Sequence, residues 1–334
     1  MSPRRAALAI AALLVCSAIS TQVPARTVVT AAGTEATRAY VVARGGQVQV
    51  LDTSDGTVLA QDDTGAATTG VAVAPHGERV YVVNGWSGVV TAVDPGTGVV
   101  GRVAIGTRLA QAVLRPDGKR LYVTGSGNAM VAVIEPEAFK LIAAIRVGNQ
   151  PQGIAVTPDG RELYVANAQD GTVSVLDTDT ASVITTVQVG GLPQQVAVSQ
   201  DGREVYVSSL RLADQAGTVT MIDAASRQVR WSADVGVGAG SLAVTSDGRH
   251  VYVALDRSVA KLDTATRTKR RLRIEAKGLA IAPGDRRVFL ATGGTAVVLD
   301  SADHTVLNTF QLSGLNGAGR GFDATAVAFE QAAR

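Results

Sequence analysis

Residues 153–190 read GIAVTPDGRELYVANAQDGTVSVLDTDTASVITTVQVG, and this stretch decides the fold of the chain. It contains four short runs rich in apolar and β-branched residues, at 154–157, 163–167, 172–177 and 183–189. Runs of this length, bounded by Gly, Asp and Pro, predict β-strands, which we letter A to D. The sequence Pro158-Asp159-Gly160 favours a turn between A and B, and Asp170-Gly171 favours a hairpin between B and C. The stretch therefore predicts one four-stranded antiparallel sheet.

The B strand of this sheet recurs along the chain as a Tyr-Val dipeptide or a close equivalent. Its aromatic residues stand 41, 41, 42, 42, 46 and 37 residues apart. A period near forty, built from short strands, is typical of a β-propeller with one blade per repeat. The chain is therefore predicted to be all-β, with seven blades marked by Tyr40, Tyr81, Tyr122, Tyr164, Tyr206, Tyr252 and Phe289.

The ring of blades is expected to close by joining the two ends of the chain. The first B strand, around Tyr40, has no A strand before it, whereas residues 324–329 match the A pattern and have no B strand after them. The C-terminal strand is thus predicted to complete the N-terminal blade, which removes the open sheet edges between first and last blades. Residues 37–330 correspond to seven repeats of 42 residues and are the predicted bounds of the propeller.

The segment before the propeller has the composition of an export signal. Arg4 and Arg5 precede a short apolar run, and Val23-Pro24-Ala25 offers a small-residue cleavage site. We expect a signal peptide over 1–25, a lead-in over 26–36 and a tail over 331–334, and hence a secreted or extracytoplasmic protein. An uncleaved anchor and lipidation at Cys16 are the alternatives. The arginine pair leaves open whether export follows the Sec or the twin-arginine route.

Removing this leader changes the charge and the cysteine content of the chain. The 31 Lys and Arg fall to 29, equal to the 29 Asp and Glu, because the leader carries two arginines and no acid. A neutral chain has no global attraction for nucleic acid or anionic lipid, so neither nucleic acid nor stable membrane insertion is expected. The single Cys lies in the leader, so the propeller is expected to be stabilised without disulfides. It is also expected to be a monomer.

The blade sequences resemble those of the YVTN-repeat β-propellers. The resemblance rests on LYVANAQDGTVSVLDTD at 163–179, VYVVNGWSGVVTAVD at 80–94 and the Gly-x-x-Pro motif at 148–151. It covers nearly all of the chain after the leader and implies a propeller. Relatives of this kind include archaeal surface-layer proteins, periplasmic propellers of the YncE type and, more distantly, lactonase-like enzymes. The resemblance therefore implies no single function and no catalytic residue.

A binding site is expected on the face that holds the D–A and B–C loops. Strands alternate in direction, so these loops share one face and the repeated Pro-Asp-Gly turns share the other. Blade five also has a long B–C connection, 208–217. Near the central channel, the entrances to the A strands form a predicted polar funnel that can hydrogen-bond a ligand or hold water. Its members are Thr69, Gln111, Gln152, Gln195, Ser241, Lys277 and Asp323.

Two further features are candidates for binding. Trp86 lies in a B–C loop, where it either stacks on a sugar or a partner side chain or packs on the neighbouring blade. The segment 267–273 is densely basic and is predicted on the outermost strand of blade six. There it discourages edge-to-edge aggregation or binds nucleic acid or an anionic wall polymer. Its cations are Arg267, Lys269, Arg270, Arg271 and Arg273.

Catalytic, metal and cofactor chemistry is weakly supported by the sequence. His76, His250 and His304 fall on different blades without metal-ligand spacing, and no Gly-x-Ser-x-Gly elbow occurs. We expect no metal and no cofactor. The leading hypothesis is a non-catalytic propeller that binds a protein, peptide or cell-envelope ligand. The alternative is a lactonase-like hydrolase or lyase at the channel, with Asp323, Lys277 or Asp256 as acid–base groups.

Overall fold

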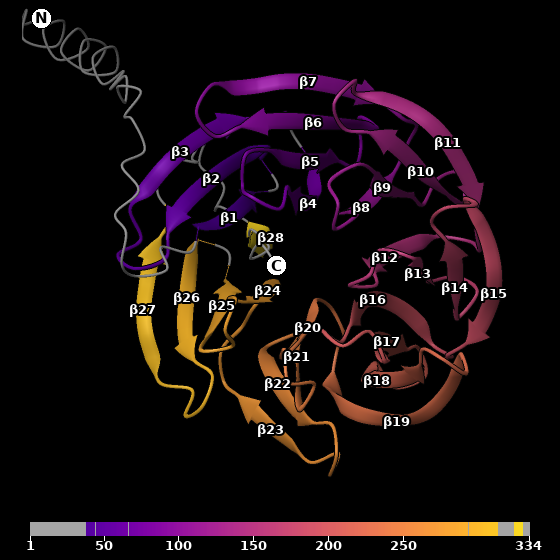
Figure 1. Ribbon diagram of the computed structural model, residues 1–334. Coiled ribbons are helices and arrows are strands. Elements are labelled where there is room, and N and C mark those ends of the chain that lie inside the picture. The colour runs from indigo at the N-terminus through magenta and orange to yellow at the C-terminus, as the bar shows by residue number, and fades with distance from the viewer. Residues whose placement is uncertain (1–37, 44, 66, 293, 313–323, 330–334) are drawn as a thin grey trace, which may run out of the picture. The chain divides into compact units, whose positions relative to one another are not determined.

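The computed structural model confirms an all-β propeller of seven four-stranded antiparallel sheets (Figure 1). It describes residues 38–43, 45–65, 67–292, 294–312 and 324–329, which belong to one compact unit, 36–334. The predicted leader, lead-in and tail lie outside the described residues. In the described part, no helix has the length and hydrophobicity needed to cross a membrane.

Each blade runs from an inner strand beside the channel to an outer strand at the circumference (Figure 1). In that order, blade one contains β28 (Ala324–Phe329), β1 (Arg38–Ala43), β2 (Gln47–Asp52) and β3 (Val58–Asp63). Blade two contains β4 (Thr68–Val73), β5 (Val80–Asn84), β6 (Val89–Asp94) and β7 (Gly98–Ala104), and blade three β8 (Leu109–Leu114), β9 (Leu121–Gly125), β10 (Met130–Glu135) and β11 (Lys140–Arg146). Blade four contains β12 (Pro151–Val156), β13 (Glu162–Asn167), β14 (Thr172–Asp177) and β15 (Ser182–Gln188).

The last three blades follow the same order. Blade five contains β16 (Leu192–Val198), β17 (Glu204–Arg211), β18 (Ala216–Asp223) and β19 (Gln228–Val237). Blade six contains β20 (Leu242–Val244), β21 (His250–Leu255), β22 (Ser258–Asp263) and β23 (Lys269–Leu272). Blade seven contains β24 (Gly278–Ile281), β25 (Arg287–Ala291), β26 (Thr295–Asp300) and β27 (Val306–Gln311).

The predicted A–B turn of blade four forms as its residue types require. Gly160 takes a φ of +75°, and its amide donates to the carbonyl of Thr157 over 2.8 Å. The carboxylate of Asp159 accepts from the Thr157 hydroxyl at 2.6 Å and from the Arg161 amide at 3.0 Å. These bonds satisfy the backbone of a tight connection, which is why the same residue types recur in other blades.

The repeated aromatic residue of the B strands joins each blade to the next. Tyr164 is fully buried and shares a hydrophobic cluster with Val196, Val207 and Ile222 of blade five. Burial of a side chain of this size contributes about 1.5–3 kcal/mol. The core is therefore a series of contacts between neighbouring blades. Six of the B-strand aromatic residues have side chains less than 2% exposed: Tyr40, Tyr122, Tyr164, Tyr206, Tyr252 and Phe289.

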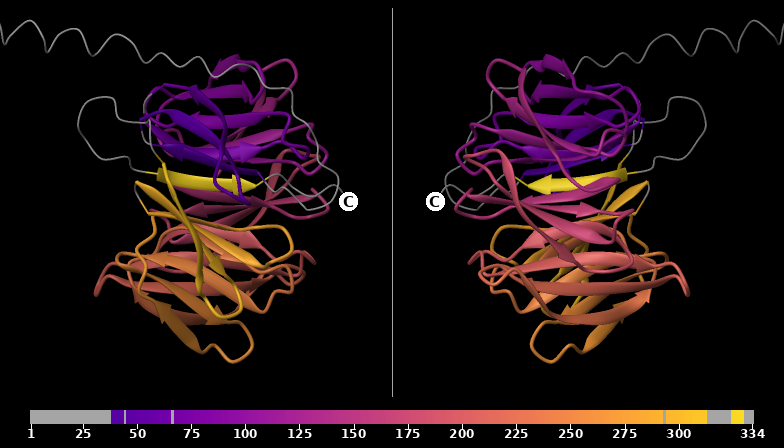
Figure 2. Two further views of the ribbon diagram at one scale, coloured as in Figure 1. Left: turned by 90° about the vertical axis from the view of Figure 1, so that its left-hand side faces the viewer. Right: turned by 90° about the vertical axis from the view of Figure 1, so that its right-hand side faces the viewer.

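The C-terminal strand closes the ring, as the sequence predicts. Strand β28 pairs with β1 in antiparallel register, with Tyr40 opposite Ala328. Figure 2 shows β28 in yellow beside the indigo strands of blade one. The Phe329 ring meets the Phe289 ring of blade seven edge-on, with centroids 4.9 Å apart. A strand from one end of the chain thus bridges the first and last blades.

The long connection expected in blade five is mostly hairpin. Strands β17 and β18 extend toward each other until Arg211 pairs with Ala216, which leaves 212–215 as the turn. Arg211 stabilises this turn through a 2.8 Å ion pair with Asp214. The extra residues therefore lengthen the sheet and do not form a separate binding loop.

Candidate functional site

A channel with a volume of about 1660 Å³ is lined by the inner strands of the blades and by Phe329. One end is bordered by A–B turn residues, among them Pro75, Pro116 and Pro158. The other end, which we call the channel mouth, contains six of the predicted funnel residues and Trp86. These six are Thr69, Gln111, Gln152, Gln195, Ser241 and Lys277, whereas Asp323 lies outside the described residues.

Hydroxyl groups fix the mouth by joining successive blades. The hydroxyl of Thr69 donates to the Leu109 carbonyl of blade three at 3.1 Å. Thr124 of blade three donates to the Gln152 carbonyl of blade four at 2.7 Å. Ser241 of blade six donates more weakly to Leu279 of blade seven at 3.4 Å. The positions of the A-strand entrances are therefore set by bonds between blades.

Gly153 allows blades four and five to approach closely at the mouth. A Cβ added there would lie 2.3 Å from Oε1 and 2.6 Å from Cα of Gln195. Distances this short exclude any larger residue unless the neighbouring backbone moves. The glycine therefore helps to set where Gln195 stands on the channel wall.

The carboxamides of Gln111 and Gln152 are available for a ligand. Both side chains are half-buried on the channel wall, and neither carboxamide makes a hydrogen bond within the described residues. Gln195 differs, because its Oε1 accepts from the Val196 amide at 3.3 Å. A carboxamide offers two donors and an acceptor oxygen, so the first two glutamines can bind either polarity of a polar ligand.

Trp86 is held at the mouth by the backbone of the residue before it. The Gly85 amide donates to Ala67 at 2.9 Å, and the Gly85 carbonyl accepts from the Leu109 amide at 3.0 Å. The Trp86 side chain is 86% exposed. The sequence left open whether Trp86 is exposed to a ligand or packs on the neighbouring blade. In the structure the indole is exposed, at the boundary of blades two and three.

The charged groups along the channel are sparse and separated. Among its described lining residues, His76 and Asp285 come from A–B turns, and Lys277 lies at the mouth. Asp256 is placed elsewhere: it lines a smaller cavity of about 240 Å³ together with Glu275 and Lys277. Among the described residues, the acid and base candidates of the hydrolase hypothesis are Asp256 and Lys277. They lie together in this small cavity, and Asp256 does not line the channel.

The basic segment 267–273 lies at the circumference of blade six, as predicted. Its side chains contact neighbouring polar groups: Lys269 donates to the Asp234 carbonyl at 3.0 Å, and Arg271 donates to the Ser258 hydroxyl at 2.9 Å. Within the described residues, none of its five cations, Arg267, Lys269, Arg270, Arg271 and Arg273, forms an ion pair.

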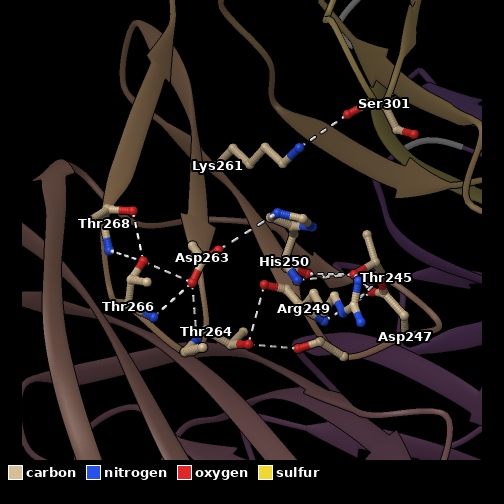
Figure 3. A network of polar contacts seen from close by, with 12 residues as sticks. Thr245, Asp247, Arg249, His250, Lys261, Asp263, Thr264, Thr266, Thr268 and Ser301 are labelled. Carbon is tan, nitrogen blue, oxygen red and sulfur yellow. Dashed lines mark hydrogen bonds and ion pairs between the residues drawn. The ribbon is translucent and has the colours of Figure 1, made fainter.

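A polar network on blade six was not anticipated from the sequence (Figure 3). Lys261 reaches from β22 to the Ser301 carbonyl of blade seven at 3.1 Å and lies 5.6 Å from the Tyr252 ring centroid. His250 lies 4.0 Å from Asp263 on the same sheet. The signal was present: SVAKLD at 258–263 aligns with TVSVLD at 172–177, so a lysine replaces an apolar repeat residue.

The surroundings of Lys261 disfavour positive charge. Burial lowers the pKa of Lys261, and Arg270 lowers it further. Burial also lowers the pKa of His304, with Lys261 and Arg270 next in effect. The described residues contain no group of three or more His, Asp or Glu side chains that is arranged to hold a metal ion.

Comparisons with known proteins support a β-propeller family. The family described as outer membrane protein assembly factor BamB matches residues 86–239, less than half of the chain. Kuenenia stuttgartiensis hydrazine synthase is 23% identical, with 70% of this chain and 76% of that chain covered and a TM-score of 0.66. A functionally unknown protein from Desulfotomaculum acetoxidans DSM 771 is 15% identical over 89% of this chain and 99% of its own, with a TM-score of 0.71.

A third similar structure is dihydro-heme d1 dehydrogenase NirN in complex with DHE. It is 14% identical over 92% of this chain and 78% of its own, with a TM-score of 0.67. No curated protein matches the chain. At these identities the structural similarity shows the fold alone, and the matches do not single out the YVTN repeats.

Proposed function

We propose that this protein is an exported, non-catalytic propeller of the YVTN type that binds a protein, peptide or cell-envelope ligand at the channel mouth. The observation that carries this proposal is the combination of free carboxamides and an exposed indole at one end of a channel of about 1660 Å³. Concave sites with a few convergent polar groups are where ligands bind most often. Export is inferred from the leader composition.

The chemistry of the mouth favours binding over catalysis. Gln111 and Gln152 orient a ligand through hydrogen bonds, and Trp86 contributes contact area that is released from water on binding. A hydrolase that uses an acid and a base needs each group within hydrogen-bond reach of the proton that it transfers on one bound substrate. The described channel residues place Lys277 at the mouth and Asp285 among the turns of the opposite end. A hydrolase that uses Asp256 and Lys277 in the smaller cavity is the second candidate.

Site-specific photocrosslinking tests which end of the channel binds. In a Cys16→Ser background, Ser126→Cys places the single thiol in the B–C turn of blade three, at the mouth but outside the proposed binding groups, and Gln200→Cys places it near the opposite end. Each variant is labelled with a benzophenone maleimide and irradiated with an isolated cell-envelope fraction. We expect a discrete adduct from the Ser126→Cys protein that unlabelled wild type competes away. The Gln200→Cys protein is the matched control and should give none.

The opposite pattern would contradict the site assignment. An adduct formed only from the Gln200→Cys protein would place binding on the Pro-Asp-Gly turn face. An adduct from the mouth that persists at equal yield in a Trp86→Ala background would show that the indole takes no part in binding.

A further inference from the structure

The seven blades provide an internal comparison that singles out one pair of side chains. In every blade, the C-strand residue opposite the buried aromatic also pairs with a residue of the outer strand. Six of these C–D pairs contain no charged residue, and the pair in blade six is Lys261–Arg270. The six are Val50–Ala60, Ala92–Gly101, Val133–Ala143, Val175–Thr185, Met221–Trp231 and Val298–Asn308.

Two like charges at one cross-strand position destabilise a sheet. Within the described residues, no carboxylate forms an ion pair with Lys261 or with Arg270. The acids of this region accept hydrogen bonds within their own turns: Asp247 from the Arg249 amide at 2.9 Å, Asp263 from the Thr266 amide at 2.7 Å and Asp303 from the Thr305 amide at 2.8 Å. The pair is therefore left without a direct ion-pair partner among the described residues, and Asp247 and Asp263 act on Lys261 only from beyond ion-pair distance.

A third nitrogen group approaches from blade seven. His304 lies in the C–D turn with a φ of +68°, and its Nε2 lies 3.3 Å from the Tyr252 hydroxyl. Its Nδ1 is buried and has no hydrogen-bond partner among the described residues. Lys261 extends to the same boundary, where it donates to Ser301, as Figure 3 shows. Blades six and seven thus bring an ammonium, a guanidinium and an imidazole together.

We propose that this boundary, which we call the seam site and define as Lys261, Arg270 and His304, binds an oxyanion of the phosphate class. The guanidinium offers a planar set of donors, and the ammonium offers a compact positive charge. A protonated imidazole adds a further donor. The site lies away from the channel mouth, so it is independent of the proposed ligand there.

The directions of the pKa shifts agree with a site for an anion. The pKa of Lys261 stays lowered although Asp247 and Asp263 act to raise it. The pKa of His304 stays lowered although Asp303 acts to raise it. An oxyanion bound among these groups would favour their charged forms, so binding should raise the pKa of His304 and strengthen as the pH falls toward it. His250 also faces Lys261, and burial and then Lys261 lower its pKa, so the signal of His304 itself is the one to follow.

Phosphate binding measured on substituted proteins tests the proposal. Lys261→Met uses the residue that blade five has at this position, Met221, and Arg270→Thr uses that of blade four, Thr185. Arg102→Thr, on the exposed outer strand of blade two, is the matched control. Isothermal titration with inorganic phosphate, against chloride at equal ionic strength, should give at least about tenfold weaker binding for the two seam variants and unchanged binding for the control.

A second readout and a second phosphate source make the test decisive. The NMR titration of His304 in wild type should move to higher pH in phosphate and should not move in Lys261→Met. Vesicles of phosphatidylglycerol, compared with phosphatidylcholine, form a separate arm: binding lost in the seam variants would identify a lipid headgroup as a source. Equal phosphate affinity in all four proteins, or no response of wild type to phosphate or to anionic vesicles, would overturn the seam site.

Discussion

Removal of residues 324–334 is expected to destabilise the propeller by about 5 kcal/mol or more, or to prevent folding altogether. The deletion takes away β28, so β1 loses its inner hydrogen-bonded neighbour, and Tyr40 and Phe289 lose apolar contacts. Each of these buried aromatic side chains accounts for about 1.5–3 kcal/mol, and the exposed inner edge of β1 adds to the loss. Urea denaturation followed by circular dichroism gives the free energy of unfolding.

A chain that ends at Phe329 is the control for this deletion. It keeps all of β28 and the Phe329–Phe289 contact, so its unfolding midpoint should lie close to that of wild type. If the shorter deletion and the longer one unfolded at the same urea concentration, ring closure by β28 would not be a source of stability.

Gly88→Ala is expected to lower the free energy of unfolding by about 3 kcal/mol, because it adds a steric clash to a backbone that disfavours alanine. Gly88 has a φ of +68°, and an added Cβ would lie 1.2 Å from the Gly106 carbonyl oxygen. The Gly88 carbonyl also accepts from the Ile105 amide at 2.8 Å. The substitution would push the hairpin that carries Trp86 away from the D–A loop of its own blade.

Gly190→Ala separates the two causes. Gly190 also has a positive φ, +78°, but an added Cβ would meet no atom within 4 Å. The Gly190→Ala substitution should lower the free energy of unfolding by about 1 kcal/mol, the contribution of the backbone conformation alone. Equal losses for the two variants in urea denaturation would refute the steric argument at Gly88.

The blade architecture could be predicted from the sequence because each blade repeats the same pattern of strands and turns. The spacing of the aromatic residues and the unpaired strands at the two ends predict seven blades and their closure, and β28 pairs with β1 accordingly. The alternation of strand direction also predicts which loops share a face. Six of the predicted funnel residues accordingly line the channel, and Asp323 lies outside the described residues.

What the sequence could not predict depends on contacts between blades. The free carboxamides of Gln111 and Gln152 follow from which neighbouring groups are already bonded, as with the hydroxyl of Thr124. The long connection of blade five was misjudged because cross-strand pairing, not composition, decides whether 208–211 continue the strand. Lys261 was not predicted as a site residue because its pairing with Arg270 stands out only when the strand registers of all seven blades are compared.

The fluorescence of Trp86 tests binding at the channel mouth most directly. Trp231→Phe leaves Trp86 as the single indole, exposed at the rim of the channel. The variant is produced with 7-azatryptophan at position 86, which is excited where the tryptophan of other proteins absorbs little, and is titrated with the solubilised cell-envelope fraction that yields the cross-linked adduct. Binding at the mouth predicts a blue shift of the emission and protection from acrylamide, with both effects weakened by Gln152→Leu. If the protein still formed the adduct with that fraction while the emission and the acrylamide quenching at position 86 stayed unchanged, this result would contradict a binding site at the mouth.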